Sequence, residues 1–243
     1  MKHFLMACSS LFISLFYLTG CGNSLSERQL PLPSSRLATA TRAFPGVVMI
    51  TGKELCSGTL VGPSTVLTAA HCLRGGGPFT VHTSKGPVQS TQQIQLGTGI
   101  EGDPHDLALL YIPSFSAPSN EIIPFAFEGS VGDTVTLVGY GCASSEMLSS
   151  GGVKRIGTNV IADQTDFLEI ATPGIQIKAI AGPENRAGAC FGDSGGPLLK
   201  QTVNGFAVIG VGHGAYNEGS RQMSQFVNLS HSINKNFLLN NIR

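Results

Sequence analysis

Short apolar runs separated by turn residues dominate this chain and constrain its fold more than any other feature. Val, Ile, Leu and Thr gather in many such runs, and the 243 residues include 31 Gly and 13 Pro. Runs of this kind between turn residues are typical of β-strands, and long charged helical stretches are few. The sequence therefore predicts an all-β fold with little helix. When the length of an export segment is subtracted from the 243 residues, enough chain remains for one domain of two small β-barrels.

The charges of the chain are balanced, with 15 Lys and Arg residues against 15 Asp and Glu residues. A chain without excess charge gives no indication of nucleic acid or an anionic surface as its main partner. No group of side chains in the sequence predicts a metal site. We therefore expect a monomer that binds no nucleic acid, no cofactor and no metal.

The amino-terminal segment has the pattern of an export signal. Lys2 and His3 precede an apolar run, residues 4–17, that is too short and wrongly flanked for a membrane span. The run ends in Leu-Thr-Gly-Cys21, which resembles the bacterial lipoprotein box, where cleavage precedes the cysteine and its sulfur is lipidated. Acyl chains on Cys21 would tether the protein to a membrane of the cell envelope. The alternative is an ordinary signal peptide.

This pattern divides the chain into three predicted parts. We expect a lipoprotein-type signal peptide at residues 1–20 and a folded domain at residues 43–243. Residues 21–42, rich in Ser, Leu, Pro and Arg without a sustained period, are interpreted as a linker or propeptide.

The cysteine count indicates an oxidising compartment. Cys8 lies in the signal and Cys21 is assigned to the lipid, which leaves four: Cys56, Cys72, Cys142 and Cys190. An even number in an exported domain predicts two disulfides, and spacing alone allows three connectivities.

A glycine-rich segment, residues 190–197 (Cys-Phe-Gly-Asp-Ser-Gly-Gly-Pro), has the composition expected around a nucleophilic serine. Attack by serine on a carbonyl creates an oxyanion, which needs preorganised backbone donors. Small residues let the chain curl so that the N–H groups of Gly192 and Ser194 point at one spot. The segment predicts Ser194 as nucleophile, with Gly192 and Ser194 forming the oxyanion hole.

A serine hydroxyl needs an adjacent base, and histidine suits this role at neutral pH. Among the six histidines, His71 alone ends an apolar run, residues 66–70, and precedes a cysteine that can fix its ring. The base in turn needs a buried carboxylate to hold its tautomer. Asp106 opens the apolar run 106–110, where an unpaired charge would cost several kcal/mol. We therefore predict that Asp106 pairs with His71.

Together, these motifs resemble the chymotrypsin and trypsin family of serine proteases. The order His71, Asp106, Ser194 is the order of that family and differs from those of the subtilisins and the α/β-hydrolases. The resemblance covers nearly the whole chain after about Ala43, from a first strand at residues 44–50 to a closing helix. It implies two six-stranded antiparallel β-barrels packed around a cleft, with a short C-terminal helix. It also implies hydrolysis of peptide bonds through an acyl-enzyme.

The resemblance selects one disulfide connectivity. Cys56 and Cys72 match the family's bridge beside the turn that carries the base. Cys142 and Cys190 remain as the second pair, which departs from the family, because its usual cysteine after the segment His213-Gly214 is absent. The alternative is that this second pair stays as free thiols.

The resemblance also implies a specificity pocket formed by Gly188, Ala189, Gly212, His213 and Gly214. Gly188 offers no acid, so we do not expect cleavage after Lys or Arg. His213 stands where the family usually has an aromatic residue, and it either recognises an acidic side chain or serves as a platform for the substrate backbone. Gly212 lacks the hydroxyl that supports the triad aspartate in relatives, which predicts a looser hydrogen-bond network around Asp106.

The activation step of the family involves Asp193. In relatives this buried carboxylate pairs with a new α-amino group that is released by cleavage after a basic residue. The usual Ile-Val-Gly-Gly start is missing here, but the Arg36-Leu37 bond lies at a plausible distance. Cleavage there would make Leu37 the partner of Asp193 and would separate the domain from Cys21. Activation and release from the membrane would then be the same event.

These observations predict an exported serine endopeptidase with polypeptide substrates, either tethered to the bacterial cell envelope or released after processing. The alternative is a catalytically silent lipoprotein of the same fold, whose cleft only holds peptides or proteins.

Overall fold

The computed structural model of the chain describes residues 43–143, 148–173 and 186–243. The expected signal peptide, Cys21, the linker and the Arg36-Leu37 bond lie outside these ranges. None of the helices within them is long and apolar enough to cross a membrane.

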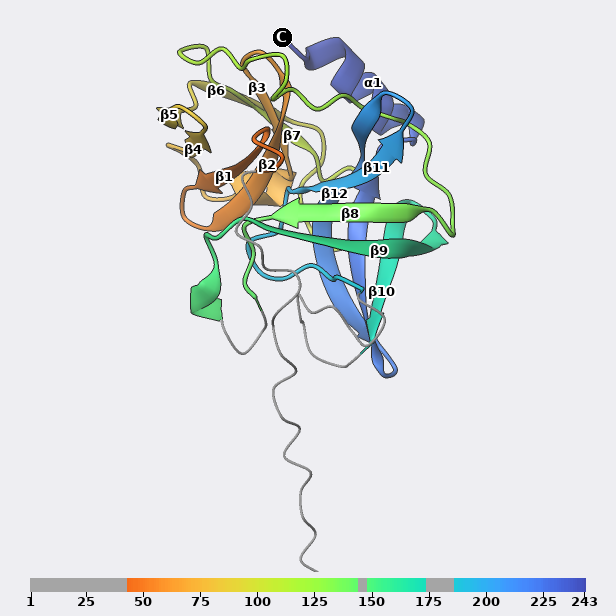
Figure 1. Cartoon of the computed structure of the whole chain (residues 1–243). Coiled ribbons are helices and arrows are strands. Elements are labelled where there is room, and N and C mark those ends of the chain that lie inside the picture. Colours follow the sequence, from red (N-terminus) through yellow and green to blue (C-terminus); the bar gives the residue numbers. More distant parts are fainter. Residues whose placement is uncertain (1–42, 144–147, 174–185) are drawn as a thin grey trace, which may run out of the picture. The chain divides into compact units, whose positions relative to one another are not determined.

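The described chain is built almost entirely of antiparallel strands, as the short apolar runs predicted (Figure 1). The strands of the N-terminal half are β1 (Val47–Thr51), β2 (Leu55–Gly62), β3 (Thr65–Thr68), β4 (Thr80–Thr83), β5 (Gly86–Gln89), β6 (Gln92–Gln95) and β7 (Ala108–Tyr111). Those of the C-terminal half are β8 (Thr134–Gly139), β9 (Arg155–Gln164), β10 (Phe167–Pro173), β11 (Pro197–Thr202), β12 (Gly205–Glu218) and β13 (Arg221–Asn228). Two short 3-10 turns, η1 (Ala70–Leu73) and η2 (Leu148–Ser150), and one helix, α1 (Ser232–Asn241), complete the elements.

The two halves form two sheets of different closure. The C-terminal strands close into a six-stranded barrel in the order β10-β13-β12-β11-β8-β9. The N-terminal strands form a seven-stranded sheet in the order β5-β4-β1-β2-β3-β7-β6, which amounts to a half-barrel. The all-β prediction with two barrel domains and a C-terminal helix is confirmed. The N-terminal half differs from the expected six-stranded closure, since its edge strands β5 and β6 are short, polar and only partly buried.

Apolar side chains from both halves meet in the larger of two core clusters. The larger cluster contains the fully buried strands β3 and β7 together with Val208, Val211 and Val227 of the C-terminal barrel. A second cluster, which includes Leu168, Ile170 and Leu198, fills the interior of that barrel. Burying one such side chain contributes roughly 1.5–3 kcal/mol, so the strand ends beside the core are held rigidly.

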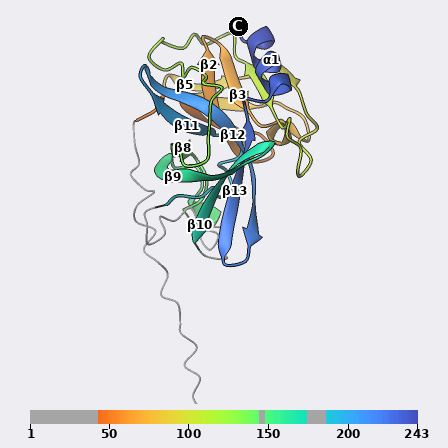
Figure 2. The ribbon, with the colours of Figure 1, turned by 90° about the vertical axis from the view of Figure 1, so that its right-hand side faces the viewer.

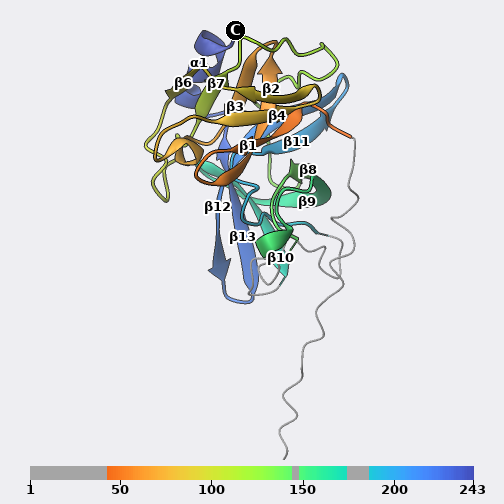
Figure 3. The same cartoon turned by 90° about the vertical axis from the view of Figure 1, so that its left-hand side faces the viewer.

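The helix α1 lies against the N-terminal sheet, although it follows the C-terminal barrel in the sequence (Figures 2 and 3). Leu238 inserts into the larger core cluster, and the hydroxyl of Tyr111 on β7 donates to the carbonyl of Asn241 at 2.8 Å. The closing helix therefore ties the end of the chain to the half that carries His71 and Asp106.

Candidate active site

His71 is held in the short turn η1 by packing and by a disulfide. The buried strand β3 leads into this turn, and Cys72 within it is bonded to Cys56 on β2, with 6.2 Å between the two Cα atoms. The second predicted disulfide, between Cys142 and Cys190, is also present. Both predicted pairings are therefore found, and the alternative of free thiols at the second pair is not.

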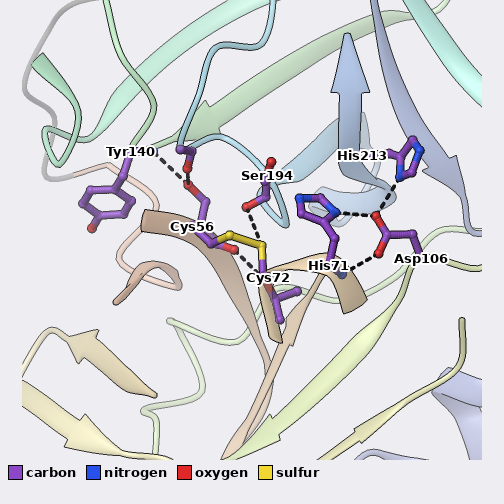
Figure 4. Close-up of a disulfide and its surroundings, with 10 residues drawn as sticks. Cys56, His71, Cys72, Asp106, Tyr140, Ser194 and His213 are labelled. Atoms are coloured by element: carbon purple, nitrogen blue, oxygen red, sulfur yellow. Dashed lines mark hydrogen bonds and ion pairs between the residues drawn. A yellow bond between two sulfur atoms is a disulfide. The ribbon is translucent and has the colours of Figure 1, made fainter. Parts of the chain in front are cut away.

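Asp106 lies at the start of the buried run that forms β7, and its side chain is fully buried. Oδ2 lies 2.6 Å from Nδ1 of His71, and Oδ1 accepts the backbone N–H of His71 at 2.8 Å (Figure 4). Burial alone would raise the pKa of Asp106. Hydrogen bonds from His213 and His71, with the charge of His71, outweigh burial and hold that pKa well below its usual range. The carboxylate therefore stays ionised beside the imidazole.

A second histidine reaches the same carboxylate, which the sequence did not predict. Nδ1 of His213, on β12, lies 2.6 Å from Oδ2 of Asp106, and the backbone N–H of Gly102 donates to Nε2 of His213 at 3.1 Å. The hydroxyl is absent at Gly212 as the sequence indicated, but the network around Asp106 is not looser, because the side chain of His213 supplies a donor in its place. The same contacts occupy both ring nitrogens of His213, which leaves neither nitrogen to recognise an acidic substrate side chain.

Ser194 is held in a tight turn between the second disulfide and β11. The carbonyl of Ser194 accepts the backbone N–H of Ser57 at 2.8 Å, and the N–H of Gly195 donates to the carbonyl of Gly212 at 2.8 Å. Gly195 has a φ of 77°, and a Cβ there would lie 2.5 Å from the carbonyl oxygen of Ser57. Only glycine fits this position, which explains the small residues after the serine.

The backbone donors beside Ser194 are available for an oxyanion. Within the described ranges, the N–H groups of Gly192 and Ser194 donate to no protein acceptor. The carbonyl of Gly192 accepts the hydroxyl of Ser57 at 2.8 Å, which anchors this turn to β2. His71 and Ser194 line the same cleft, but no hydrogen bond joins their side chains among the described residues. Such contacts are often long in unliganded enzymes and tighten when substrate binds.

The carboxylate of Asp193, a residue that also lines the cleft, is held by backbone donors. It accepts the backbone N–H groups of Gly141 at 2.8 Å and Cys190 at 2.9 Å. Burial raises the pKa of Asp193 to about 6, although the two backbone donors and the charge of Arg155 act against it. The guanidinium of Arg155 donates to the carbonyl of Gly141 at 2.6 Å. Leu37, the expected partner of Asp193, lies outside the described residues.

A cavity of about 20 Å³ is lined by both Asp193 and Arg155. Gly188 and Ala189 also line it. A space of this size holds about one water molecule. Nε of Arg155 is buried without a hydrogen-bond partner, so a water there would find a donor beside the carboxylate.

The candidate active-site cleft has a volume of about 560 Å³ and lies beside Ser194 and His71. Of the five residues expected in the specificity pocket, Ala189, Gly212, His213 and Gly214 line this cleft, whereas Gly188 lines the small cavity behind it. The rim carries an exposed aromatic ring, since Phe191 is 61% exposed. No acidic side chain comes from the expected pocket residues.

Glu169 is a buried acid behind the cleft wall that the sequence analysis missed. Its two carboxylate oxygens accept hydrogen bonds of 2.8 Å from the hydroxyl of Tyr216 and the amide of Gln225, and both of these residues line the cleft. Burial, together with this hydrogen bond and the nearby acids, raises the pKa of Tyr216 to about 12. The signal in the sequence was an acid within the apolar run at residues 167–171.

A second missed residue is Gly99, which packs against the backbone of His71. Its φ is 66°, and a Cβ there would lie 2.7 Å from the Cα of His71. The loop that contains Gly99 and Gly102 therefore contacts the base directly on one side of the cleft.

A family model described as Trypsin matches residues 36–235. The chain is 30% identical to human kallikrein-8 over 207 residues, which cover 78% of this chain and 79% of that protein. It is 26% identical to trypsin alpha of Drosophila melanogaster over 214 residues, 78% of this chain and 81% of that protein. Human heparin binding protein has a similar structure, with a TM-score of 0.64 and 19% identity over 86% of this chain and 96% of that one.

Proposed function

Because the chain belongs to the trypsin family of serine proteases, we propose that it is an exported serine endopeptidase that forms an acyl-enzyme on Ser194. The observation that carries this proposal is the hydrogen-bonded pair of His71 and Asp106 beside Ser194 in one cleft. A buried carboxylate paired with an imidazole next to a serine is the arrangement that serine nucleophiles require.

The hydrogen bonds of His71 determine which of its ring nitrogens can act as the base in the proposed reaction. Nδ1 of His71 donates to Asp106, which leaves Nε2 to take the proton of the Ser194 hydroxyl as its oxygen bonds to the substrate carbonyl. The same proton passes to the leaving amine, and the peptide C–N bond breaks. Water then repeats the sequence on the ester and releases the acid product. Asp106 stays ionised throughout and stabilises the imidazolium.

The N–H groups of Gly192 and Ser194 are proposed as the oxyanion hole. They find no acceptor among the described residues and so need not break a hydrogen bond when the oxyanion forms. Losing one such donor typically lowers kcat about 100- to 1,000-fold.

We further propose a neutral or apolar preference at the residue before the cut. Neither Gly188 nor Ala189 offers an acid to a basic side chain, and Glu169 is only 7% exposed behind Tyr216 and Gln225. Glu101, the exposed acid of the cleft, belongs to the loop beside His71 and not to the expected pocket. A cationic side chain among the expected pocket residues would therefore be desolvated without a partner. A polypeptide cut after Lys or Arg is therefore an unfavourable substrate.

The remaining proposals concern location and activation. We propose export with a lipid tether at Cys21, a monomeric state, and no nucleic-acid partner, from the sequence pattern described above. Cleavage between Arg36 and Leu37 stays a proposal for activation and release. The family model begins at residue 36, which is compatible with a mature domain that starts near this bond.

The rival function is a silent binding module. A protein named for heparin binding has the same fold, and fold by itself does not decide between catalysis and binding. Nothing in the geometry of His71, Asp106 and Ser194 favours this rival. It remains the alternative outcome of the following test.

Covalent labelling of Ser194 by a fluorescent organophosphonate tests the proposal. We expect one probe per wild-type molecule by mass, located on Ser194, and none on the matched control Ser194→Ala. The reaction needs an activated nucleophile and not merely a cleft. If neither the chain beginning at residue 22 nor the chain beginning at Leu37 is labelled, the silent binding module is the correct function.

A further inference from the structure

We propose that His213 is a positioning residue for the triad. His213 is a neutral imidazole with its proton on Nδ1, and it holds the carboxylate of Asp106, which in turn holds His71. The proposal rests on the proposed function and assigns the support of the aspartate to an imidazole instead of a hydroxyl.

The backbone places His213 where its side chain can point inward. In the ladder between β12 and β13, Gly212 pairs with Phe226 and Gly214 pairs with Gln225, so the register shifts at His213. A bulge of this kind redirects the side chain of the extra residue. The side chain of His213 is accordingly only 5% exposed, although its backbone borders the cleft.

The hydrogen bonds of His213 determine its tautomer. The backbone N–H of Gly102 can only donate, so Nε2 of His213, which accepts it at 3.1 Å, carries no proton. The ring proton must then be on Nδ1, which lies 2.6 Å from Oδ2 of Asp106 and donates to it. His213 is therefore a neutral donor to the carboxylate and not a second cation.

Packing fixes the plane of the His213 ring. The ring of Phe167 stacks on it with a centroid distance of 5.1 Å and an interplanar angle of 25°. On another side, the rings of His213 and His71 meet edge to face at 6.1 Å and 78°. The two imidazoles therefore approach one carboxylate oxygen from different directions, as Figure 4 shows.

The consequence is a carboxylate held by three donors. Oδ2 of Asp106 accepts from both rings and Oδ1 accepts the backbone N–H of His71, so three donors fix the group in the fully buried position. A carboxylate held in this way keeps the Nδ1–H tautomer of His71 and aims its Nε2 at the serine. Without His213, one of the three donors to the buried carboxylate is lost, and only the two from His71 remain.

His213 also connects Asp106 to the cleft wall. Gly102, its second partner, lines the cleft together with Gly99 and Glu101, and has a φ of 79°. One side chain on β12 thereby links the substrate-facing loop to the triad. Two kinds of hydrogen bond can be separated by substitution, since one ring nitrogen serves Asp106 and the other serves Gly102.

Three substitutions separate the two bonds. His213→Phe keeps the ring and the stacking on Phe167 and removes both hydrogen bonds. His213→Asn places an amide N–H where Nδ1 stood and so retains only the bond to Asp106. His213→Gln reaches the position of Nε2 and retains only the bond to Gly102. His82→Phe is the matched control, because His82 lies on β4 and bonds to Thr51, outside the cleft.

The expected result is a loss in kcat that follows the bond to Asp106. His213→Phe and His213→Gln should lower kcat about 10- to 150-fold with KM unchanged, which is the range for a hydrogen bond to a charged group. His213→Asn should restore most of kcat, and His82→Phe should leave it unchanged. An unchanged kcat in His213→Phe, or an equal loss in the Asn and Phe variants, would overturn the proposal.

A second measurement does not depend on activity. In protein labelled with ¹⁵N-histidine, two-bond ¹H–¹⁵N spectra at neutral pH should show His213 with a protonated Nδ1 and a bare Nε2. A proton on Nε2 of His213 contradicts the proposal even if the enzyme is active. If the phosphonate probe leaves wild-type Ser194 unlabelled while the predicted tautomer is observed, the proposed function fails and the placement of His213 stands.

Discussion

Replacing Asp193 with Asn tests how the buried carboxylate beside the nucleophile is compensated. In the folded chain the pKa of Asp193 is raised to about 6 from its ordinary value of 3.8, because burial outweighs the donors from Gly141 and Cys190 and the charge of Arg155. A raised folded-state pKa means that the folded protein binds this proton more tightly than the unfolded chain does. The group therefore stabilises the fold fully below its ordinary pKa, and this contribution is lost as pH rises through about 6.

The size of the effect follows from the difference between the two pKa values. A difference of about two pH units, at about 1.4 kcal/mol each, corresponds to about 3 kcal/mol of unfolding free energy. For a domain of this length, that is roughly 6–12 °C in Tm. The Asn variant carries no charge at any pH and should lack this pH-dependent contribution to the free energy of unfolding.

The assay is thermal and urea unfolding between about pH 4 and pH 7.5, with Ser194→Ala as the background so that self-digestion cannot interfere. We expect the Asp193 protein to lose up to about 3 kcal/mol more than Asp193→Asn over this range. Parallel pH curves for the two proteins would refute the reasoning, because they would mean that the carboxylate is compensated in the folded chain.

The same assay examines the proposed cleavage at Arg36. If the α-amino group of Leu37 reaches Asp193, the ammonium lowers the pKa of the carboxyl, and the sign of the pH effect reverses. In a chain that begins at Leu37, stability from Asp193 would then be present at neutral pH and lost in acid. If both chains lose stability as the pH rises, Leu37 is not the partner.

Three further outcomes are expected. Asp106→Asn should lower kcat about 10,000-fold with little change in fold, as in the chymotrypsin-type triad, because the amide favours the wrong histidine tautomer. Steady-state kinetics measure kcat, and a loss under tenfold contradicts this prediction. Gly195→Ala should abolish phosphonate labelling, since a Cβ would collide with Thr68 and the φ of 77° disfavours alanine; normal labelling would disprove the collision. Changing Cys142 and Cys190 together to Ser should cost about 2–4 kcal/mol in urea unfolding, because the bridge spans 48 residues; an unchanged midpoint would count against it.

The local patterns of the sequence were sufficient for the fold class, and they singled out the three residues that we propose as the triad. The apolar run before His71 and the run after Asp106 became the neighbouring strands β3 and β7, which pair from Thr65–Tyr111 to Thr68–Ala108. Each run reports its own burial through its composition, so its structure could be predicted without tertiary information.

Closure of the two sheets could not be predicted in the same way. The C-terminal barrel closes, whereas the N-terminal sheet ends in two short polar strands that leave it open. Closure depends on the register and tilt of all strands together, which no single segment reports.

The Asp, His and Ser that the sequence identified are local signals, because each sits in a segment whose small or apolar neighbours are needed for its chemistry. The second histidine partner of Asp106, His213, was determined by the tertiary structure. Which residue of the Gly212-His213-Gly214 segment faces the carboxylate depends on one register shift between β12 and β13, 107 residues along the chain from Asp106. Hydrogen bonds act over about 3 Å and are set by that packing, so the supporting histidine became visible only in the folded structure.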